Sequence, residues 1–231
     1  MHWSYVKQLI DNLNLFDAEK VADDKQRSYT MTSDLLGIEE KHVSKAKTFT
    51  DKDMRKVLTY IATTRHAARN RAIVLTTHYA GLRVGETAAL RIGDVLAEDG
   101  TIKEEMVLTA EQTKGKHART VYLGEKLRKE LLDYLAGIDC SDLTRTLFAT
   151  QKKRDGFSAN TLAQHLFWLY KRAGLTGASS HSGRRTFITN LASKGVGVRV
   201  LMSLAGHRNI GTTQAYIDVN DDMLRSAVAL I

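Results

Sequence analysis

The sequence contains no proline and only one cysteine, Cys140, among its 231 residues. A single cysteine excludes an internal disulfide framework and a cysteine-based zinc site, so we expect a reducing, intracellular compartment. Without proline there are no proline-rich linkers, and glycine has to mark most turns and helix ends. No apolar run approaches the length that spans a bilayer, and Lys7 and Asp11 interrupt any signal-like start. Membrane and secreted proteins are therefore not expected.

The charge is positive and unevenly distributed along the chain. Lys and Arg number 34 and Asp and Glu number 26, which gives a net charge of +8. Residues 1–47 carry 7 basic and 8 acidic groups, so residues 48–231 carry 27 − 18 = +9. A segment this basic indicates a polyanion partner, because Lys and Arg release the counterions condensed on phosphates. A basic surface that only confers solubility is the alternative.

The residue pattern divides the chain near Lys47. Residues 1–47 contain two weakly periodic stretches separated by polar residues, which predicts a short helical appendage. Thr50 and Asp53 then form a capping-box pattern, the signature of a helix start. We therefore expect the main domain to cover 48–231.

Within the main domain the patterns favour helices. Helices are predicted over 51–63, 67–80, 84–91, 125–136, 158–173, 181–194, 197–205 and 221–231. Two strand-like runs, 105–110 and 118–123, flank the loop Thr113-Lys114-Gly115-Lys116 and predict one hairpin. The expected fold is mainly α with a small antiparallel β-hairpin, in the α+β class.

Motifs for metal or nucleotide chemistry are missing. The acidic pairs Asp221-Asp222 and Glu104-Glu105 have no partner motif at ligand spacing. The sequence also has no HExxH, P-loop or GxGxxG motif. We expect no metal site and no cofactor, and hydrolysis by two metal ions is not expected.

Basic side chains instead follow the predicted helix ends. Arg83 comes directly after a helix that Gly81 stops, and Glu86 lies three residues further on, where it can hold the guanidinium from behind. A lone Arg beside a Glu is more often a surface ion pair. The fixed turn nevertheless makes Arg83 a candidate for binding an anion.

The carboxy-terminal half repeats this pattern. His181 and Arg184 are three residues apart on a predicted helix, so they share one face and can bind one phosphate together. His207 follows the helix-stopping Gly206, and Tyr216 comes nine residues later. Taken singly, each histidine reads as structural and the tyrosine as a core aromatic. Their order and spacing together favour a catalytic set.

This set resembles the tyrosine recombinase family, also called the phage integrase family. The matches are a Gly-Leu-Arg-x-x-Glu box at 81–86, a Lys-bearing hairpin at 114, a His-x-x-Arg box at 181–184, and Leu-x-Gly-His followed by Thr-Thr-Gln-x-Tyr ending at 216. Four boxes in this order over about residues 48–220 are highly specific. The resemblance implies the family's catalytic-domain fold and reads 1–47 as a reduced or truncated core-binding region.

The resemblance also implies a mechanism without a metal or nucleotide cofactor. Tyr216 would attack a scissile DNA phosphate and form a 3′-phosphotyrosyl bond, which conserves the phosphodiester until a 5′-hydroxyl attacks it. Arg83, Arg184 and His207 would stabilise the charge that develops on the phosphate. His181 would accept the tyrosine proton.

Two lysines compete for the role of general acid. Lys114 matches the residue that protonates the leaving 5′-oxygen in this family, and Lys116 is the alternative because an extended strand would turn both side chains to one side. Further DNA contacts are expected from four residues, Lys116, Arg119, Arg185 and Arg208.

The resemblance finally implies partners and a role. We expect a site-specific recombinase that integrates or excises a mobile element in a prokaryotic cytoplasm, associated with the nucleoid. It would act as a tetramer on two double-stranded DNA sites, with an accessory directionality factor as a further partner. The helix at 221–231 would dock on a neighbouring protomer or pack on its own domain. A type IB topoisomerase-like nicking-closing enzyme and a non-catalytic DNA-binding regulator are the alternatives.

Overall fold

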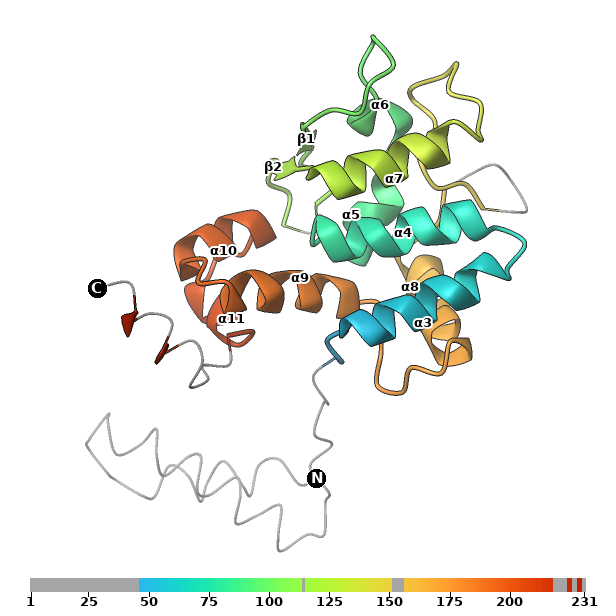
Figure 1. Ribbon diagram of the computed structural model, residues 1–231. Coiled ribbons are helices and arrows are strands. Elements are labelled where there is room, and N and C mark those ends of the chain that lie inside the picture. The colour runs from blue at the N-terminus through green and yellow to red at the C-terminus, as the bar shows by residue number, and fades with distance from the viewer. Residues whose placement is uncertain (1–45, 114, 151–155, 218–223, 226–227, 230–231) are drawn as a thin grey trace, which may run out of the picture. The chain divides into compact units, whose positions relative to one another are not determined.

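The computed structural model describes residues 46–113, 115–150, 156–217, 224–225 and 228–229. Within these ranges it contains nine helices and two strands (Figure 1). The predicted appendage 1–47, apart from its last two residues, and most of the predicted helix 221–231 lie outside the described residues. No described helix is long and apolar enough to cross a membrane.

Helix α3 (Asp51–Ala62) begins at the predicted capping box. The Thr50 hydroxyl accepts a hydrogen bond from the Asp53 backbone N–H at 3.2 Å, and the Asp53 carboxylate accepts one from the Thr50 N–H at 3.1 Å. Met54, Val57 and Ile61 are buried on one side of the helix. The predicted start of this helix is confirmed, and its apolar stripe covers the core.

Helix α4 (Ala67–Tyr79) is the centre of the domain. It packs against α3, against α7 (Glu125–Leu135) and against α9 (Ser182–Ser193) (Figure 1). Its middle is buried on every side, including the polar Thr77, whose hydroxyl donates to the Val74 carbonyl at 2.8 Å. Gly183 of α9 lies where any Cβ would overlap the Thr77 side chain. This close approach fixes both helices, whose ends carry Arg83 and Arg184.

The predicted hairpin is present with shorter strands. Strand β1 (Glu105–Leu108) pairs antiparallel with β2 (Arg119–Tyr122), and Met106 lies opposite Val121. The ladder ends after Leu108 because the Thr109 N–H bonds to the Gln112 side chain at 2.8 Å and starts a turn. Lys116 lies in the predicted loop, but its φ of 51° shows that the extended backbone expected around it is wrong.

Two short helices were not predicted, α6 (Ile92–Val95) and α11 (Ile210–Gln214). Helix α5 (Val84–Ala89) ends two residues before the predicted boundary because Leu90 is extended. The Arg91 N–H then bonds to the Asp94 carboxylate at 2.8 Å, which starts α6. Short helices held by one side-chain bond leave little periodicity for a sequence pattern to show.

The last long helices follow their predicted caps. Helix α8 (Ala159–Arg172) begins at Ser158, whose hydroxyl accepts from the Thr161 N–H. Helix α10 (Val198–Ala205) ends at Gly206, which has a φ of 61° in the left-handed region that favours glycine. The predicted α+β class, mainly α with one small sheet, is confirmed.

Candidate active site

A pocket of about 570 Å³ opens where the start of α5, the loop between β1 and β2, and the turn after α10 meet. The charged and titratable side chains that line it are Arg83, Glu86, His117, Arg119, His207 and Arg208. Glu86 is the one carboxylate among the lining residues. Among the residues that the structure describes, no group of three or more His, Cys, Asp or Glu side chains could hold a metal ion. The pocket therefore presents mainly positive charge to whatever enters it.

Arg83 is fixed by the turn between α4 and α5. Its backbone N–H donates to Glu86 Oε2 at 2.8 Å, and its Nη1 donates to Glu86 Oε1 at 2.9 Å. Its Nη2 donates to the carbonyl of Gly206 at 3.1 Å, which ties the start of α5 to the turn after α10. Glu86 thus holds the guanidinium from behind, as the sequence predicted. The Arg83 side chain remains 30% exposed, so it can still meet a ligand.

Glu86 also binds a second arginine, which sequence reasoning missed. Arg119 of β2 donates from Nη2 to Glu86 Oε2 at 2.8 Å and from Nη1 to the Leu204 carbonyl at 3.0 Å. Burial alone would raise the pKa of Glu86, but the hydrogen bonds and charges of Arg119 and Arg83 hold it below its ordinary value. No sequence signal joins positions 33 residues apart. Arg119, which is expected to contact DNA, lines the pocket and bonds to a carboxylate and a helix end in this structure.

Arg184 lies under the pocket rather than in its lining. It is 3% exposed, and it donates from Nη1 to the Gly81 carbonyl at 2.7 Å and from Nη2 to the Ala205 carbonyl at 2.5 Å. These carbonyls belong to the turns that carry Arg83 and His207. Burial, and then the charge of Arg83, lower the pKa of Arg184 to about 9, so it is cationic at neutral pH. Arg184 therefore braces both turns and adds positive charge below the pocket.

His207 and Tyr216 meet beside this charge. His207 Nδ1 lies 2.8 Å from the hydroxyl of the fully buried Thr213, and burial followed by the charge of Arg184 lowers the pKa of His207 to about 4. The Tyr216 ring stacks on the imidazole, with centroids 5.8 Å apart and planes at 23°. The guanidinium of Arg185 also lies over the Tyr216 ring, 5.7 Å from its centre. Thr213, which belongs to the Thr-Thr-Gln-x-Tyr box, is a further site residue to which the sequence assigned no role.

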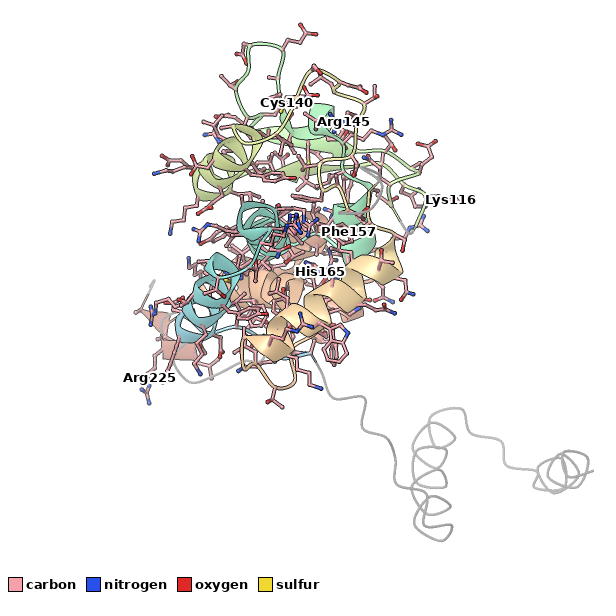
Figure 2. The ribbon with its side chains drawn as sticks, turned by 90° about the vertical axis from the view of Figure 1, so that its right-hand side faces the viewer. Lys116, Cys140, Arg145, Phe157, His165 and Arg225 are labelled. Carbon is pink, nitrogen blue, oxygen red and sulfur yellow. The ribbon has the colours of Figure 1, made fainter. Side chains whose placement is uncertain are left out.

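The remaining candidates are less closely joined to the pocket. His181 is exposed at the residue preceding α9, one turn before Arg185. Lys114 lies outside the described residues, although its neighbours Thr113 and Gly115 line the pocket. Lys116 is exposed at the outer part of the same loop (Figure 2). The exposed Arg208 lines the rim and extends the positive surface.

The fold and the pocket together define a class of site. Guanidinium and imidazole groups surround a space, and Tyr216 stacks on one of these imidazoles. The arrangement suits a phosphodiester, whose oxygens accept several charged hydrogen bonds. A sequence model of the phage integrase family matches residues 47–223. The chain belongs to the phage integrase family.

The relatives are tyrosine recombinases. The chain is 29% identical over 182 residues to tyrosine recombinase XerA of Pyrococcus furiosus, covering 79% of this chain and 60% of the relative. It is 32% identical over 184 residues to XerA of Thermococcus kodakarensis, covering 78% and 61%. The chain thus spans about three fifths of the length of these curated relatives.

Solved structures share the fold. A crystal structure of XerA recombinase matches with a TM-score of 0.62 at 24% identity, covering 83% of this chain and 65% of that one. The Tn1549 transposon integrase in complex with circular intermediate DNA matches with a TM-score of 0.63 at 16% identity, covering 97% and 82%. The expected tyrosine recombinase catalytic-domain fold is confirmed.

Proposed function

We propose that the chain is the catalytic part of a site-specific DNA recombinase or integrase that cleaves and rejoins DNA through Tyr216. The observation that carries this proposal is the stack of Tyr216 on His207, a residue that lines one pocket with Arg83. It puts a tyrosine, whose phenol can act as a nucleophile, next to a histidine that shares a pocket with an arginine. We infer the type of reaction from the family to which the chain belongs.

The reaction needs no outside energy source. The Tyr216 phenol oxygen attacks the phosphorus, its proton passes to His181, and the P–O5′ bond breaks as the 5′-oxygen takes a proton from Lys114. One P–O bond forms and one breaks, leaving a 3′-phosphotyrosyl bond and a free 5′-hydroxyl. Attack by a 5′-hydroxyl reverses the same steps and releases the tyrosine. A 5′-hydroxyl from a second duplex yields recombined strands.

Fixed positive charge lowers the barrier. Negative charge grows on the non-bridging oxygens as phosphorus becomes five-coordinate, and donors already in place stabilise it without reorganising. Arg83 donates one N–H of Nη1 to Glu86 and one N–H of Nη2 to the Gly206 carbonyl. The second N–H of each nitrogen is left for a phosphate oxygen. Arg184 acts from below through its charge and through the turns that it braces.

The His207–Thr213 contact decides what His207 can donate. A neutral imidazole carries one N–H, and the lowered pKa makes His207 neutral at pH 7. If the Thr213 hydroxyl donates to Nδ1, the proton of His207 resides on Nε2 and can be donated to a phosphate oxygen. We assign this tautomer to the active form, which makes Thr213 a positioning residue.

Lys114 is assigned as the general acid from its place in the loop. Thr113 is buried, and its hydroxyl donates to the His117 carbonyl at 2.9 Å and accepts from the His117 N–H at 3.1 Å. These two bonds hold Thr113, which precedes Lys114 in the sequence, at the pocket. Gly115, which follows Lys114, lines the pocket as well. Lys116 remains the alternative.

The assembly follows the family. A tetramer holding two duplexes would exchange strands, and the exposed Leu224 and Val228 offer apolar contacts for a neighbouring protomer. The helical appendage 1–47 would supply a reduced second grip on DNA. Integration or excision of a mobile element in a prokaryotic cytoplasm, aided by a directionality factor, is the role we assign. The Tn1549 transposon integrase, whose solved complex contains circular intermediate DNA, supports that role.

Covalent trapping tests the proposal. A nicked suicide duplex bearing a candidate attachment site should form a protein–DNA adduct with the natural chain and none with Tyr216→Phe. Tyr122→Phe is the matched control, because Tyr122 is 61% exposed on β2 and outside the pocket lining. Equal trapping by Tyr216→Phe would refute the nucleophile. Adducts that only reseal their own strand would indicate a nicking-closing enzyme instead.

A further inference from the structure

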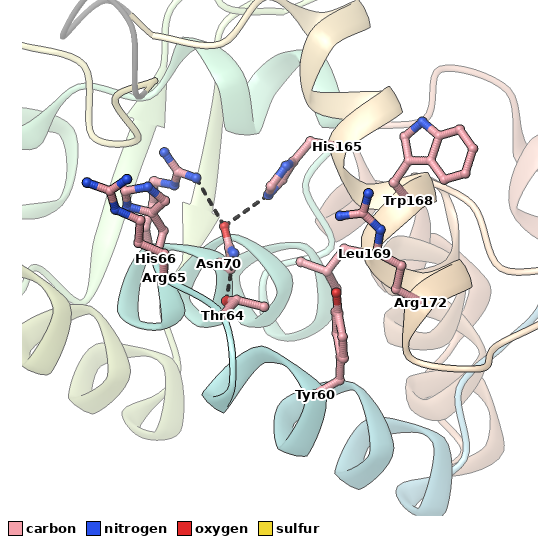
Figure 3. Close-up of a pocket in the computed structure, with 10 residues that line it drawn as sticks. Tyr60, Thr64, Arg65, His66, Asn70, His165, Trp168, Leu169 and Arg172 are labelled. Atoms are coloured by element: carbon pink, nitrogen blue, oxygen red, sulfur yellow. Dashed lines mark hydrogen bonds between the residues drawn. The ribbon is translucent and has the colours of Figure 1, made fainter.

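A second pocket, of about 180 Å³, lies between the turn that joins α3 to α4 and the face of α8 (Figure 3). We call it the α3–α8 pocket. Its lining includes three arginines and two histidines, Arg65, His66, Arg69, His165 and Arg172, and no Asp or Glu. The described salt bridges include none of these arginines. The pocket therefore gathers positive charge that no lining carboxylate balances.

Buried donors in this pocket lack partners among the described residues. Arg69 is 9% exposed; its Nη1 donates to the Ala149 carbonyl at 2.8 Å and its Nη2 to Asn70 Oδ1 at 3.3 Å, but its Nε is buried without a hydrogen bond. His66 Nε2 is buried without a hydrogen bond as well. Both atoms have almost no accessible surface, so they are unsatisfied polar atoms in the pocket wall, and the donors that a ligand can reach are those of the exposed Arg65 and Arg172.

Asn70 holds the inner wall of the pocket in place. Its Oδ1 also lies 2.9 Å from His165 Nε2, and its Nδ2 donates to the Thr64 hydroxyl at 3.2 Å (Figure 3). Asn70 Oδ1 thus accepts hydrogen bonds from both Arg69 and His165. These bonds hold the two side chains in place before a ligand enters. The site is thus preformed.

The start of α4 adds to the attraction. The helix begins at Ala67 with His66 as its cap residue, no side chain caps it, and its first turn contains no acidic residue. The positive end of a 13-residue helix is left uncompensated beside the arginines. Burial, and then the nearby cations, lower the pKa of His165 to about 4, so His165 is neutral at pH 7 and the arginines supply the positive charge of the pocket.

We propose that the α3–α8 pocket binds a phosphate group. Its volume equals about six water molecules at about 30 Å³ each, which suits one oxyanion and its waters and is below the size of a typical cofactor site. Three arginines match the several acceptor oxygens of a phosphate. The pocket lies at the opposite end of α4 from Arg83, about 20 Å along the helix. This inference does not depend on the proposed function.

The phosphate has two possible sources, a DNA backbone and free inorganic phosphate. The exposed Trp168 lines the rim, and the ammonium of Lys171 lies 5.1 Å from its ring centre. An aromatic face beside a phosphate site can stack a nucleobase. Both sources present the same chemistry to the arginines, so the experiment has an arm for each.

The first arm titrates inorganic phosphate into the full chain by calorimetry at constant ionic strength. Arg65→Gln/Arg172→Gln should weaken phosphate binding at least tenfold, because each change removes a cation from the lining. Both side chains are exposed, so the fold should survive, and thermal unfolding without phosphate checks this. Arg55→Gln, an exposed change on α3 outside the lining, should leave binding within twofold.

The first pocket is also cationic, so the titration is repeated with Arg83→Gln. Binding that persists in Arg83→Gln and is lost when Arg65→Gln/Arg172→Gln is added to that variant supports the proposal. The proposal is overturned if Arg83→Gln alone abolishes binding, or if adding Arg65→Gln/Arg172→Gln leaves the phosphate affinity of Arg83→Gln unchanged. A change in oligomeric state with unchanged phosphate binding would overturn it in favour of a protein carboxylate in the pocket.

The second arm measures duplex DNA affinity against salt concentration. If a backbone phosphate fills the pocket, the logarithmic salt slope of Arg65→Gln/Arg172→Gln should fall by about one for each backbone phosphate that the variant no longer binds, with no such change for Arg55→Gln. An unchanged slope in a variant that no longer binds inorganic phosphate assigns the site to the free anion.

Discussion

Replacing Glu86 with Gln should destabilise the domain strongly. Glu86 is 1% exposed, and its carboxylate accepts from the backbone and the guanidinium of Arg83 and from Arg119. Glutamine keeps the shape and one acceptor oxygen but removes the charge that balances both arginines. Removing one partner of a buried ion pair costs about 3–5 kcal/mol. Because one oxygen remains, we expect a loss of about 3 kcal/mol from a total of about 5–15 kcal/mol.

Urea unfolding followed by far-ultraviolet circular dichroism measures this loss. With a slope of about 2 kcal/mol per molar urea, the midpoint should fall by about 1.5 M. Glu130→Gln is the matched control, since Glu130 also pairs with an arginine, Arg71, whose side chain is 43% exposed. An exposed pair contributes at most about 1 kcal/mol. A loss in Glu86→Gln no greater than in Glu130→Gln would show that the buried charge does not hold the pocket together.

Further outcomes concern catalysis and pH. Arg83→Ala should lower DNA cleavage by a factor of about 100 or more with a much smaller loss of DNA affinity, measured by adduct formation and by anisotropy; a parallel fall would mean that Arg83 only positions DNA. Cleavage by Lys114→Ala should recover on a substrate with a 5′-bridging thiolate, and recovery by the corresponding Lys116 variant instead would exchange the two lysines. Thr213→Val should lower the cleavage rate about tenfold while leaving DNA affinity unchanged, and an unaltered rate would refute the assigned tautomer of His207. The pKa of His207 is about 4 in the folded chain and 6.5 in the unfolded chain, so its contribution to stability is present above pH 6.5 and is lost as the pH falls toward 4. The free energy of unfolding should fall by up to about 1.4 kcal/mol per pH unit in this range. His207→Gln should flatten this dependence on pH in urea unfolding.

Local rules predicted the parts of the fold that local forces decide. The capping box at Thr50 and Asp53, the cap at Ser158 and the stop at Gly206 were all readable, because each depends on a few adjacent residues. The same holds for the bond between Arg83 and Glu86, three residues apart.

Contacts between distant segments were beyond such rules. Nothing in the sequence places Arg119 against Glu86 and Leu204, or Arg184 against the carbonyls of Gly81 and Ala205. These bonds depend on how α4, α9, α10 and the hairpin pack. The loop at 113–116 was predicted, but the turn within it, in which the Lys116 N–H donates to the Thr113 carbonyl at 3.2 Å, was not.

The two bonds of Arg119 have a mechanical consequence. Its guanidinium joins strand β2 to Glu86 and to the last turn of α10, so it links the hairpin to the two turns that Arg83 and Arg184 already hold together. Loop 109–118 joins β1 to β2, and Gln112 within it donates to the Ala89 carbonyl at 3.2 Å and to the Asp94 carboxylate at 2.6 Å. Residues inserted into this loop should therefore leave the alignment of Arg83 and His207 intact, provided that Lys114, the Gln112 contacts and Arg119 are kept.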